Sequence, residues 1–230
     1  MRLALAVALA APLIGGIVAE DSMAGEKHSA DRMATVTLPA PRLDGGVSLE
    51  HALAERRSVR EFARGALTMA QVAQLLWAAQ GVTHRDGART APSAGALYPL
   101  ELYLAAGEVR DLAAGLYRHV PGKHQLELAA AGDLRRRLCA AALEQECVAD
   151  GAVVFVFAAV EGRTTRKYGP RGVRYVHIEV GHAAQNLVLQ ATALGLGSVT
   201  VGAFNDAAVA RLLDLPKGEA PLYLVPVGLR

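Results

Sequence analysis

Three arginines and a serine lie close together in the sequence ERRSVREF, residues 55–62. In an extended backbone the side chains alternate sides, so Arg56, Ser58 and Arg60 would point one way and Arg57 the other. A guanidinium group keeps its charge and binds phosphate through paired hydrogen bonds. The spacing therefore indicates a phosphate-binding segment, with a solvated basic loop as the alternative.

The familiar nucleotide-binding patterns do not accompany this segment. The sequence has no GxxxxGK[ST], which a P-loop nucleoside triphosphatase needs, and no GxSxG hydrolase elbow. GLGSVTVG (195–202) approximates a dinucleotide loop, but Thr200 replaces the third glycine and the order of helix and strand is reversed. A phosphate-bearing cofactor other than a Rossmann-bound dinucleotide is the simplest expectation.

Hydrophobic periodicity predicts the elements that position the segment. Helices are predicted over 49–55, 68–81, 133–146, 172–194 and 205–213. Strands are predicted over 100–106, 115–120, 124–128, 152–160, 198–204 and 221–228. The apolar run 152–160 is the candidate central strand, and Thr68 with Gln71 forms a predicted capping box. Helices and strands mix without strict alternation, which favours an α+β fold.

Composition indicates a globular chain with an N-terminal leader. The 230 residues are 52% hydrophobic and carry a net charge of +2, which excludes a disordered polyelectrolyte and gives no case for nucleic acid as a partner. Residues 1–19 read as a signal peptide, 20–47 as a flexible linker and 48–230 as one domain. We expect an exported protein without a membrane span in the mature chain; an uncleaved N-terminal anchor is the alternative.

Other reactive side chains are weaker candidates. On one straight helix Cys139 and Cys147 would be about 12 Å apart, too far for a disulfide, whereas a helix that ends between them would allow one. They are interpreted as two small buried residues. Glu179 and His182 could ligate a metal, but no third ligand is evident, so no metal site is predicted. The arginines at 135–137 are expected to form a solvated helix face.

Three stretches in order carry a family resemblance: RRSVREF (56–62), APSAGALYP (91–99) and GHAAQNLVLQATALGLGSVTVGAF (181–204). They resemble the nitroreductase family, which binds FMN, over about 49–230. KYGPRGVRY (167–175) is similar to the SagB/ThcOx branch, the azoline dehydrogenases. The resemblance implies an α+β fold with a central, mainly antiparallel sheet flanked by helices. It also implies a homodimer with the cofactor at the subunit interface.

The resemblance assigns cofactor-binding residues position by position. Arg56, Arg57, Ser58 and Arg60 would hold the FMN phosphate, ribityl chain and pyrimidine edge. The partner subunit's copy of a proline-serine turn would pack on the flavin; in this sequence the turn is Pro92, Ser93, Ala94 and Gly95. A backbone N–H near Val201, Gly202 and Ala203 would reach flavin N5, and Gln145 would contact the cofactor.

Lys167 and Tyr168 match the pair that the azoline dehydrogenase branch uses for proton abstraction. Aromatising an azoline needs loss of a hydride and of a proton, so a base beside the flavin is chemically sensible. Two departures from the family pattern stand out. GALYP (95–99) replaces the Asn-x-Gln-Pro-Trp of general nitroreductases, and Arg230 lies one place later than the usual C-terminal basic residue.

The resemblance implies an FMN-dependent oxidoreductase that moves a hydride between flavin N5 and a small molecule or peptide azoline. An NAD(P)H-dependent nitro or quinone reductase is one alternative. A flavin-binding scaffold without turnover is another.

Overall fold

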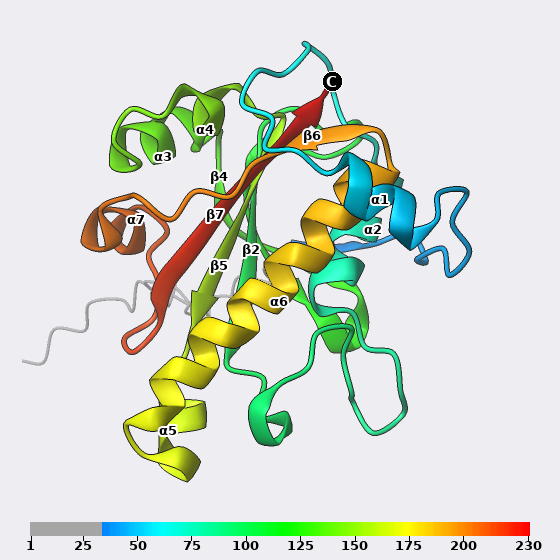
Figure 1. Cartoon of the computed structure of the whole chain (residues 1–230). Helices are drawn as coiled ribbons and strands as arrows, with labels where there is room; N and C mark the ends of the chain where they lie inside the picture. Colours follow the sequence, from blue (N-terminus) through cyan, green and yellow to red (C-terminus); the bar gives the residue numbers. More distant parts are fainter. Residues whose placement is uncertain (1–33) are drawn as a thin grey trace, which may run out of the picture. The chain divides into compact units, whose positions relative to one another are not determined.

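The computed structural model describes residues 34–230, which form one seven-stranded sheet covered by helices on both faces (Figure 1). The strands lie in the order β1-β4-β3-β2-β5-β7-β6, and each neighbouring pair is antiparallel. The predicted α+β fold with a mainly antiparallel sheet is therefore confirmed. The signal peptide predicted over 1–19 lies outside the described residues.

The strands are β1 (Thr35–Thr37), β2 (Leu100–Ala106), β3 (Gly115–Val120), β4 (Gln125–Ala131), β5 (Val153–Ala159), β6 (Leu196–Ser198) and β7 (Ala220–Leu229). The main helices are α1 (Leu49–Glu55), α2 (Met69–Gln80), α3 (Arg135–Ala141), α4 (Glu146–Asp150), α5 (Gly162–Tyr168), α6 (Arg171–Ala193) and α7 (Asp206–Leu212). In the part of the chain that the structure describes, none of the helices is both long and apolar enough to cross a bilayer.

Strand β5 lies between the two hydrophobic cores of the fold. Its side chains alternate between two cores: Phe155 and Phe157 face the core under α2 and α6, whereas Val154 and Val156 face the core under α3, α4 and α7. All of its residues are buried, which explains why this strand reads as a continuous apolar run rather than an alternating one. The prediction of a central buried strand over 152–160 is confirmed.

The helix signals at α2 and α6 also hold. The Thr68 hydroxyl accepts the N–H of Gln71, and the Gln71 side chain accepts the Thr68 N–H, which completes the capping box. α2 ends at Gly81, as predicted. α6 spans 23 residues and packs against α2, α5 and α1, so it is the central helix of one helical layer.

Several stretches differ from the sequence prediction: the strand expected over 198–204 is instead β6 at Leu196–Ser198, and α5 was not predicted. The helix expected over 133–146 breaks after α3, where Leu143 and Glu144 both have left-handed backbone angles (φ 58° and 56°), and α4 begins at Glu146. Cys139 and Cys147 are buried free thiols on the two helices. The linker expected over 20–47 includes β1, which pairs with β4 and closes that edge of the sheet.

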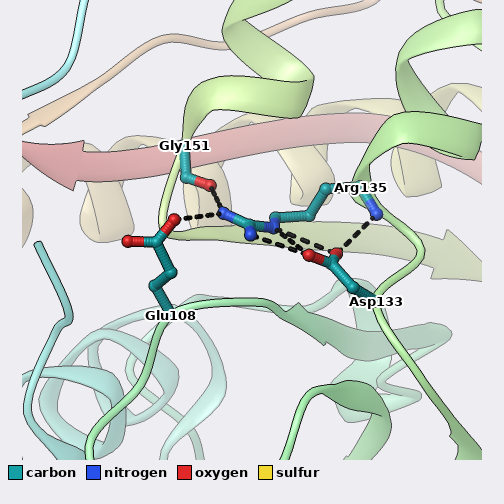
Figure 2. A network of polar contacts seen from close by, with 4 residues as sticks. All are labelled: Glu108, Asp133, Arg135 and Gly151. Carbon is teal, nitrogen blue, oxygen red and sulfur yellow. Dashed lines mark hydrogen bonds and ion pairs between the residues drawn. The ribbon is translucent and has the colours of Figure 1, made fainter. Parts of the chain in front are cut away.

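Arg135 is not on a solvated helix face, as the sequence suggested for 135–137, but is buried (Figure 2). Its guanidinium pairs with Asp133 at 2.7 Å and donates to the Gly151 carbonyl at 2.6 Å, and it reaches Glu108 at 3.5 Å. A Cβ on Gly107 would lie 1.8 Å from Arg135 Nε, so only glycine leaves room for the guanidinium there. The network ties the β2–β3 loop to α3 and to the start of β5.

Candidate active site

The segment after α1 is extended, as its spacing predicted. Ser58 forms a parallel bridge to Ser198, and the N–H of Val59 donates to the Ser198 carbonyl at 2.9 Å. Val59 points inward and packs where Gly197 has no side chain, whereas Ser58 and Arg60 are exposed on the opposite side. We call Arg56, Ser58 and Arg60, together with Gln145 and residues 201–203, the arginine half of the site.

Arg57 has a different role in the structure from its neighbours. Its Nη1 donates to the carbonyls of Ala54 and Arg56, both at 2.8 Å. These carbonyls belong to the C-terminal end of α1, where a cation is favourable. The Arg57 side chain is therefore engaged in capping α1.

Gln145 and the 201–203 segment join the arginine half from other elements. The Gln145 amide donates to the Ala203 carbonyl at 2.8 Å. Burial raises the pKa of the Cys147 thiol on α4, and the charge of the nearby Arg60 opposes this rise. The N–H of Val201 donates to Leu224 and is not available to a ligand. Gly202 and Ala203 are exposed, and within residues 34–230 their N–H groups have no hydrogen-bond partner.

The turn half of the site is Pro92–Gly95 together with Lys167 and Tyr168. Gly95 has a left-handed backbone angle (φ 65°), and a Cβ there would lie 2.8 Å from Tyr168 Oη and 2.9 Å from Lys167 Nζ. Both side chains therefore lie directly against the glycine. The Lys167 ammonium also lies 5.4 Å from the centroid of the Tyr168 ring. The structure thus brings together the two groups that the sequence predicted separately.

Two arginines fix the chain around this turn. Arg163, one turn before Lys167 on α5, donates to the Tyr98 carbonyl at 3.0 Å and pairs with the buried carboxylate of Glu101. Arg89 lies over the Tyr98 ring at 4.4 Å, and its backbone N–H donates to the Tyr98 hydroxyl. α5 and the segment that follows the turn are therefore held in one arrangement.

Glu179, which the sequence suggested only as a possible metal ligand, lies beside the turn half. It is 2% exposed, its Oε1 has no hydrogen-bond partner in the described chain, and it lines a cavity of about 270 Å³ with Pro92, Ser93 and Ala94. Burial raises its pKa to about 7, against the opposing effects of Ser93 and Arg89.

The sequence held a signal for this residue. Tyr175, Glu179 and His182 are four and three residues apart, so they share one face of α6 and line the same cavity. Tyr175 also packs edge-on against Tyr168, with ring centroids 5.1 Å apart, which connects this face to the turn half.

The two halves lie toward opposite ends of α6. Ser58 bridges to Ser198, beyond the C-terminal end of α6, whereas the turn lies against Glu179 in its N-terminal half. From Glu179 to Ala193 the helix rises about 21 Å, at about 1.5 Å per residue. In Figure 1, α5 lies at one end of α6, and α1 with β6 at the other.

The model of the Nitroreductase family matches residues 53–229. The chain therefore belongs to the nitroreductase family, whose members are flavin oxidoreductases.

Individual relatives agree with this assignment. The chain is 46% identical over 182 residues to a nitroreductase homologue of Methanocaldococcus jannaschii, covering 79% of this chain and 91% of that protein. A nitroreductase homologue of Ralstonia eutropha has a TM-score of 0.75 at 33% identity, over 87% of this chain and 90% of that one. A chain of the Escherichia coli microcin synthetase McbBCD complex, with truncated pro-MccB17 bound, has a TM-score of 0.64 at 25% identity, over 84% and 76%.

Proposed function

We propose that the chain is an FMN-dependent dehydrogenase of the SagB/ThcOx type, which oxidises an azoline in a small molecule or peptide. The observation that carries the proposal is the contact of Lys167 and Tyr168 with Gly95, because it puts a proton acceptor beside a backbone surface suited to a flat ring. The likeness to a chain of a microcin synthetase complex that holds a peptide supports the same substrate class.

The residues of the arginine half fit FMN. Among the described residues, neither Arg56 nor Arg60 forms an ion pair, so both guanidinium groups are free to bind phosphate. The free N–H groups of Gly202 and Ala203 are the candidates to donate to the flavin ring, now that Val201 is engaged in the sheet. The Gln145 side-chain oxygen would remain as an acceptor.

When bound, FMN supplies a two-electron hydride acceptor at N5. The chain supplies the proton chemistry. Lys167, once in its neutral amine form, would accept the proton that the azoline loses, with the Tyr168 hydroxyl beside it to orient or relay that proton. The packing of Tyr168 on Tyr175, and the anchoring of α5 by Arg163, would hold both groups in place.

The separation of the two halves along α6 supports a homodimer in which each flavin lies between subunits. The arginine half of one chain would hold the phosphate, and the turn half of its partner would pack on the ring. A two-fold dimer of this kind makes two identical sites.

NAD(P)H-dependent reduction of nitro or quinone compounds is the second candidate. Its support is the 46% identity to the archaeal nitroreductase homologue. Stopped-flow mixing with NADH or NADPH would distinguish the two: rapid bleaching of the flavin favours the reductase, whereas bleaching by an azoline substrate alone favours the dehydrogenase.

The test of cofactor binding begins with the absorption spectrum of the purified chain, in which we expect flavin bands and FMN as the released compound. Replacing both Arg56 and Arg60 by alanine removes charge-assisted hydrogen bonds and should weaken FMN binding by about 100-fold or more. Arg110→Ala/Arg211→Ala removes the same charge from two exposed positions elsewhere and should leave the affinity unchanged. Equal affinity in the two double variants would contradict the proposal.

Export is a further part of the proposal, resting on the apolar run near the N-terminus that follows Arg2. Mass spectrometry of the protein recovered from the host would show a chain beginning near residue 20 if the leader is cleaved. Outside the cell nicotinamide donors are scarce, so an oxidase that passes electrons to O₂ or to a membrane carrier would suit that location.

A further inference from the structure

The geometry of the turn half points to a role for Glu179: we infer that this carboxyl sets the direction of the Ser93 hydroxyl. It thereby decides whether this hydroxyl offers a bound ring a hydrogen-bond donor or only an acceptor. Glu179 is thus a positioning residue that acts through Ser93. The inference rests on the proposed function, in which the ring on the turn is a flavin.

The Ser93 hydroxyl has one hydrogen and two lone pairs. The backbone N–H of Tyr98 donates to Ser93 Oγ at 2.9 Å, so one lone pair is always occupied. Glu179 and Ser93 line the same cavity, so an ionised Glu179, which can only accept, draws the Ser93 hydrogen toward itself. The face of Ser93 toward a ligand then offers only its remaining lone pair.

When Glu179 is protonated, it can donate instead. Its O–H can fill the second lone pair of Ser93, which leaves the Ser93 hydrogen free to point toward a ligand. The oxidised flavin ring carries carbonyl oxygens at its edge, and such an acceptor is satisfied only by the second arrangement. The protonated state should therefore bind oxidised flavin more tightly.

The surroundings of Glu179 allow both states near neutral pH. Among the described residues its Oε1 is buried without a partner, and Arg89, the cation that acts on its pKa, is engaged by the Gln80 side chain at 2.7 Å and by the Tyr98 ring. Tyr175 and His182 line the same cavity from α6, and Lys167 and Tyr168 lie against Gly95 from α5. Burial raises the pKa of Glu179 to about 7, so ordinary buffers reach both forms.

The experiment is a series of FMN dissociation constants between about pH 6 and about pH 8 for the apo protein and for Glu179→Gln. Glutamine keeps an N–H donor toward Ser93 at every pH. Because the phosphate of FMN itself titrates near pH 6, the quantity compared is the ratio of the wild-type constant to the variant constant at each pH, in which the phosphate titration cancels.

We expect this ratio to rise about fivefold across the range, with a midpoint near pH 7, which is the effect of one hydrogen bond. Ser93→Ala should bind weakly, with a flat ratio to Glu179→Gln. Glu219→Gln is the matched control: Glu219 also has a buried, unpartnered Oε1 and a pKa raised by burial, but it lies beside Tyr103, and its ratio to wild type should be flat.

A flat ratio of wild type to Glu179→Gln, in protein that binds FMN, would overturn the inference alone. No FMN binding by the wild type at any pH would overturn the proposed function and this inference with it. Difference infrared spectroscopy gives a readout without flavin: a carboxyl C=O band of the apo protein should be lost between the same pH limits and be missing in Glu179→Gln.

Discussion

Glu179 and His119 are buried ionisable residues whose effects on stability oppose each other. The pKa of Glu179 is raised from 4.5 to about 7, and burial lowers the pKa of His119 from 6.5 to about 3. The stability from Glu179 is fully present below pH 4.5 and is lost as the pH rises to about 7. The stability from neutral His119 is present above pH 6.5 and is lost as the pH falls to about 3.

We therefore expect Glu179→Gln to be as stable as wild type at low pH and more stable above about pH 7, by about 3 kcal/mol for the full shift. Urea unfolding at a series of pH values measures this directly. His119→Gln should instead reduce the loss of stability in acid. A constant difference between Glu179→Gln and wild type at all pH values would show that Glu179 does not titrate in this window.

Gly95 allows Lys167 and Tyr168 to lie against the turn. Gly95→Ala places a Cβ 2.8 Å from Tyr168 Oη and 2.9 Å from Lys167 Nζ, and strains a backbone at φ 65° by about 1 kcal/mol. We expect turnover to fall more than tenfold while the protein remains folded, as judged by thermal unfolding. Gly122→Ala, where a Cβ has nothing within 4 Å, should not change turnover. Equal activity in the two variants would show that the position of the Lys–Tyr pair does not matter for the reaction.

The arginine segment, the proline-serine turn and the Lys–Tyr pair could be singled out from the sequence, but the burial and protonation of Glu179 and His119 could not. The spacing of Arg56, Ser58 and Arg60 was sufficient to predict an extended segment with these side chains on one side, because extended backbone fixes side-chain direction locally. The burial of Glu179 depends on a turn more than 80 residues away in the chain, which helix periodicity does not contain.

At the scale of elements, Arg163 links α5 to the segment after the turn, in addition to the packing of α5 on α6. Arg163 joins α5 to the Tyr98 carbonyl and to Glu101, while Arg166 on the same helix is exposed and bonds only within α5. Arg163→Met should lower kcat about tenfold, because Lys167 loses its fixed position, with little change in FMN affinity. Arg166→Ala is the control, and steady-state kinetics with flavin titration separates the two effects.

Arg135 stabilises the connection between α3 and the sheet. Arg135→Met leaves the Gly151 carbonyl without its donor and the Asp133 carboxylate with only the backbone N–H of residue 135, and should cost about 3 kcal/mol in the free energy of unfolding. Arg137→Ala, on the exposed side of α3, should cost little. Chemical denaturation of both variants checks this; similar losses would mean that the network in Figure 2 adds little net stability.

Most elements followed from local signals, and the exceptions have physical reasons. α2 and α7 have side-chain caps that the sequence displays, at Thr68 and Asn205. The break between α3 and α4 has no glycine or proline to announce it. β1 is three residues long, and only its pairing with β4 makes it a strand, so no periodicity could reveal it.

At the scale of the whole molecule, the proposed shared site makes a prediction that a single-chain site does not. Arg56→Ala/Arg60→Ala damages one half, and Lys167→Ala damages the other, so each homodimer should be inactive. After mixing and subunit exchange, half of the dimers should be mixed, each with one intact site, which restores about a quarter of wild-type activity. Activity assays before and after exchange test this, and no recovery in confirmed mixed dimers would place both halves of each site in one chain.

The left-handed pair Leu143 and Glu144 has a consequence for how this chain can vary. Each L-residue in that conformation costs about 1 kcal/mol, so the connection holds conformational strain that glycine would relieve. The pair directly precedes Gln145, the N-cap residue of α4, whose side chain reaches Ala203. Lengthening the connection by one residue would redirect Gln145, whereas glycine at either position preserves the path and relaxes the backbone. The segment should therefore accept glycine at either position but not an added residue.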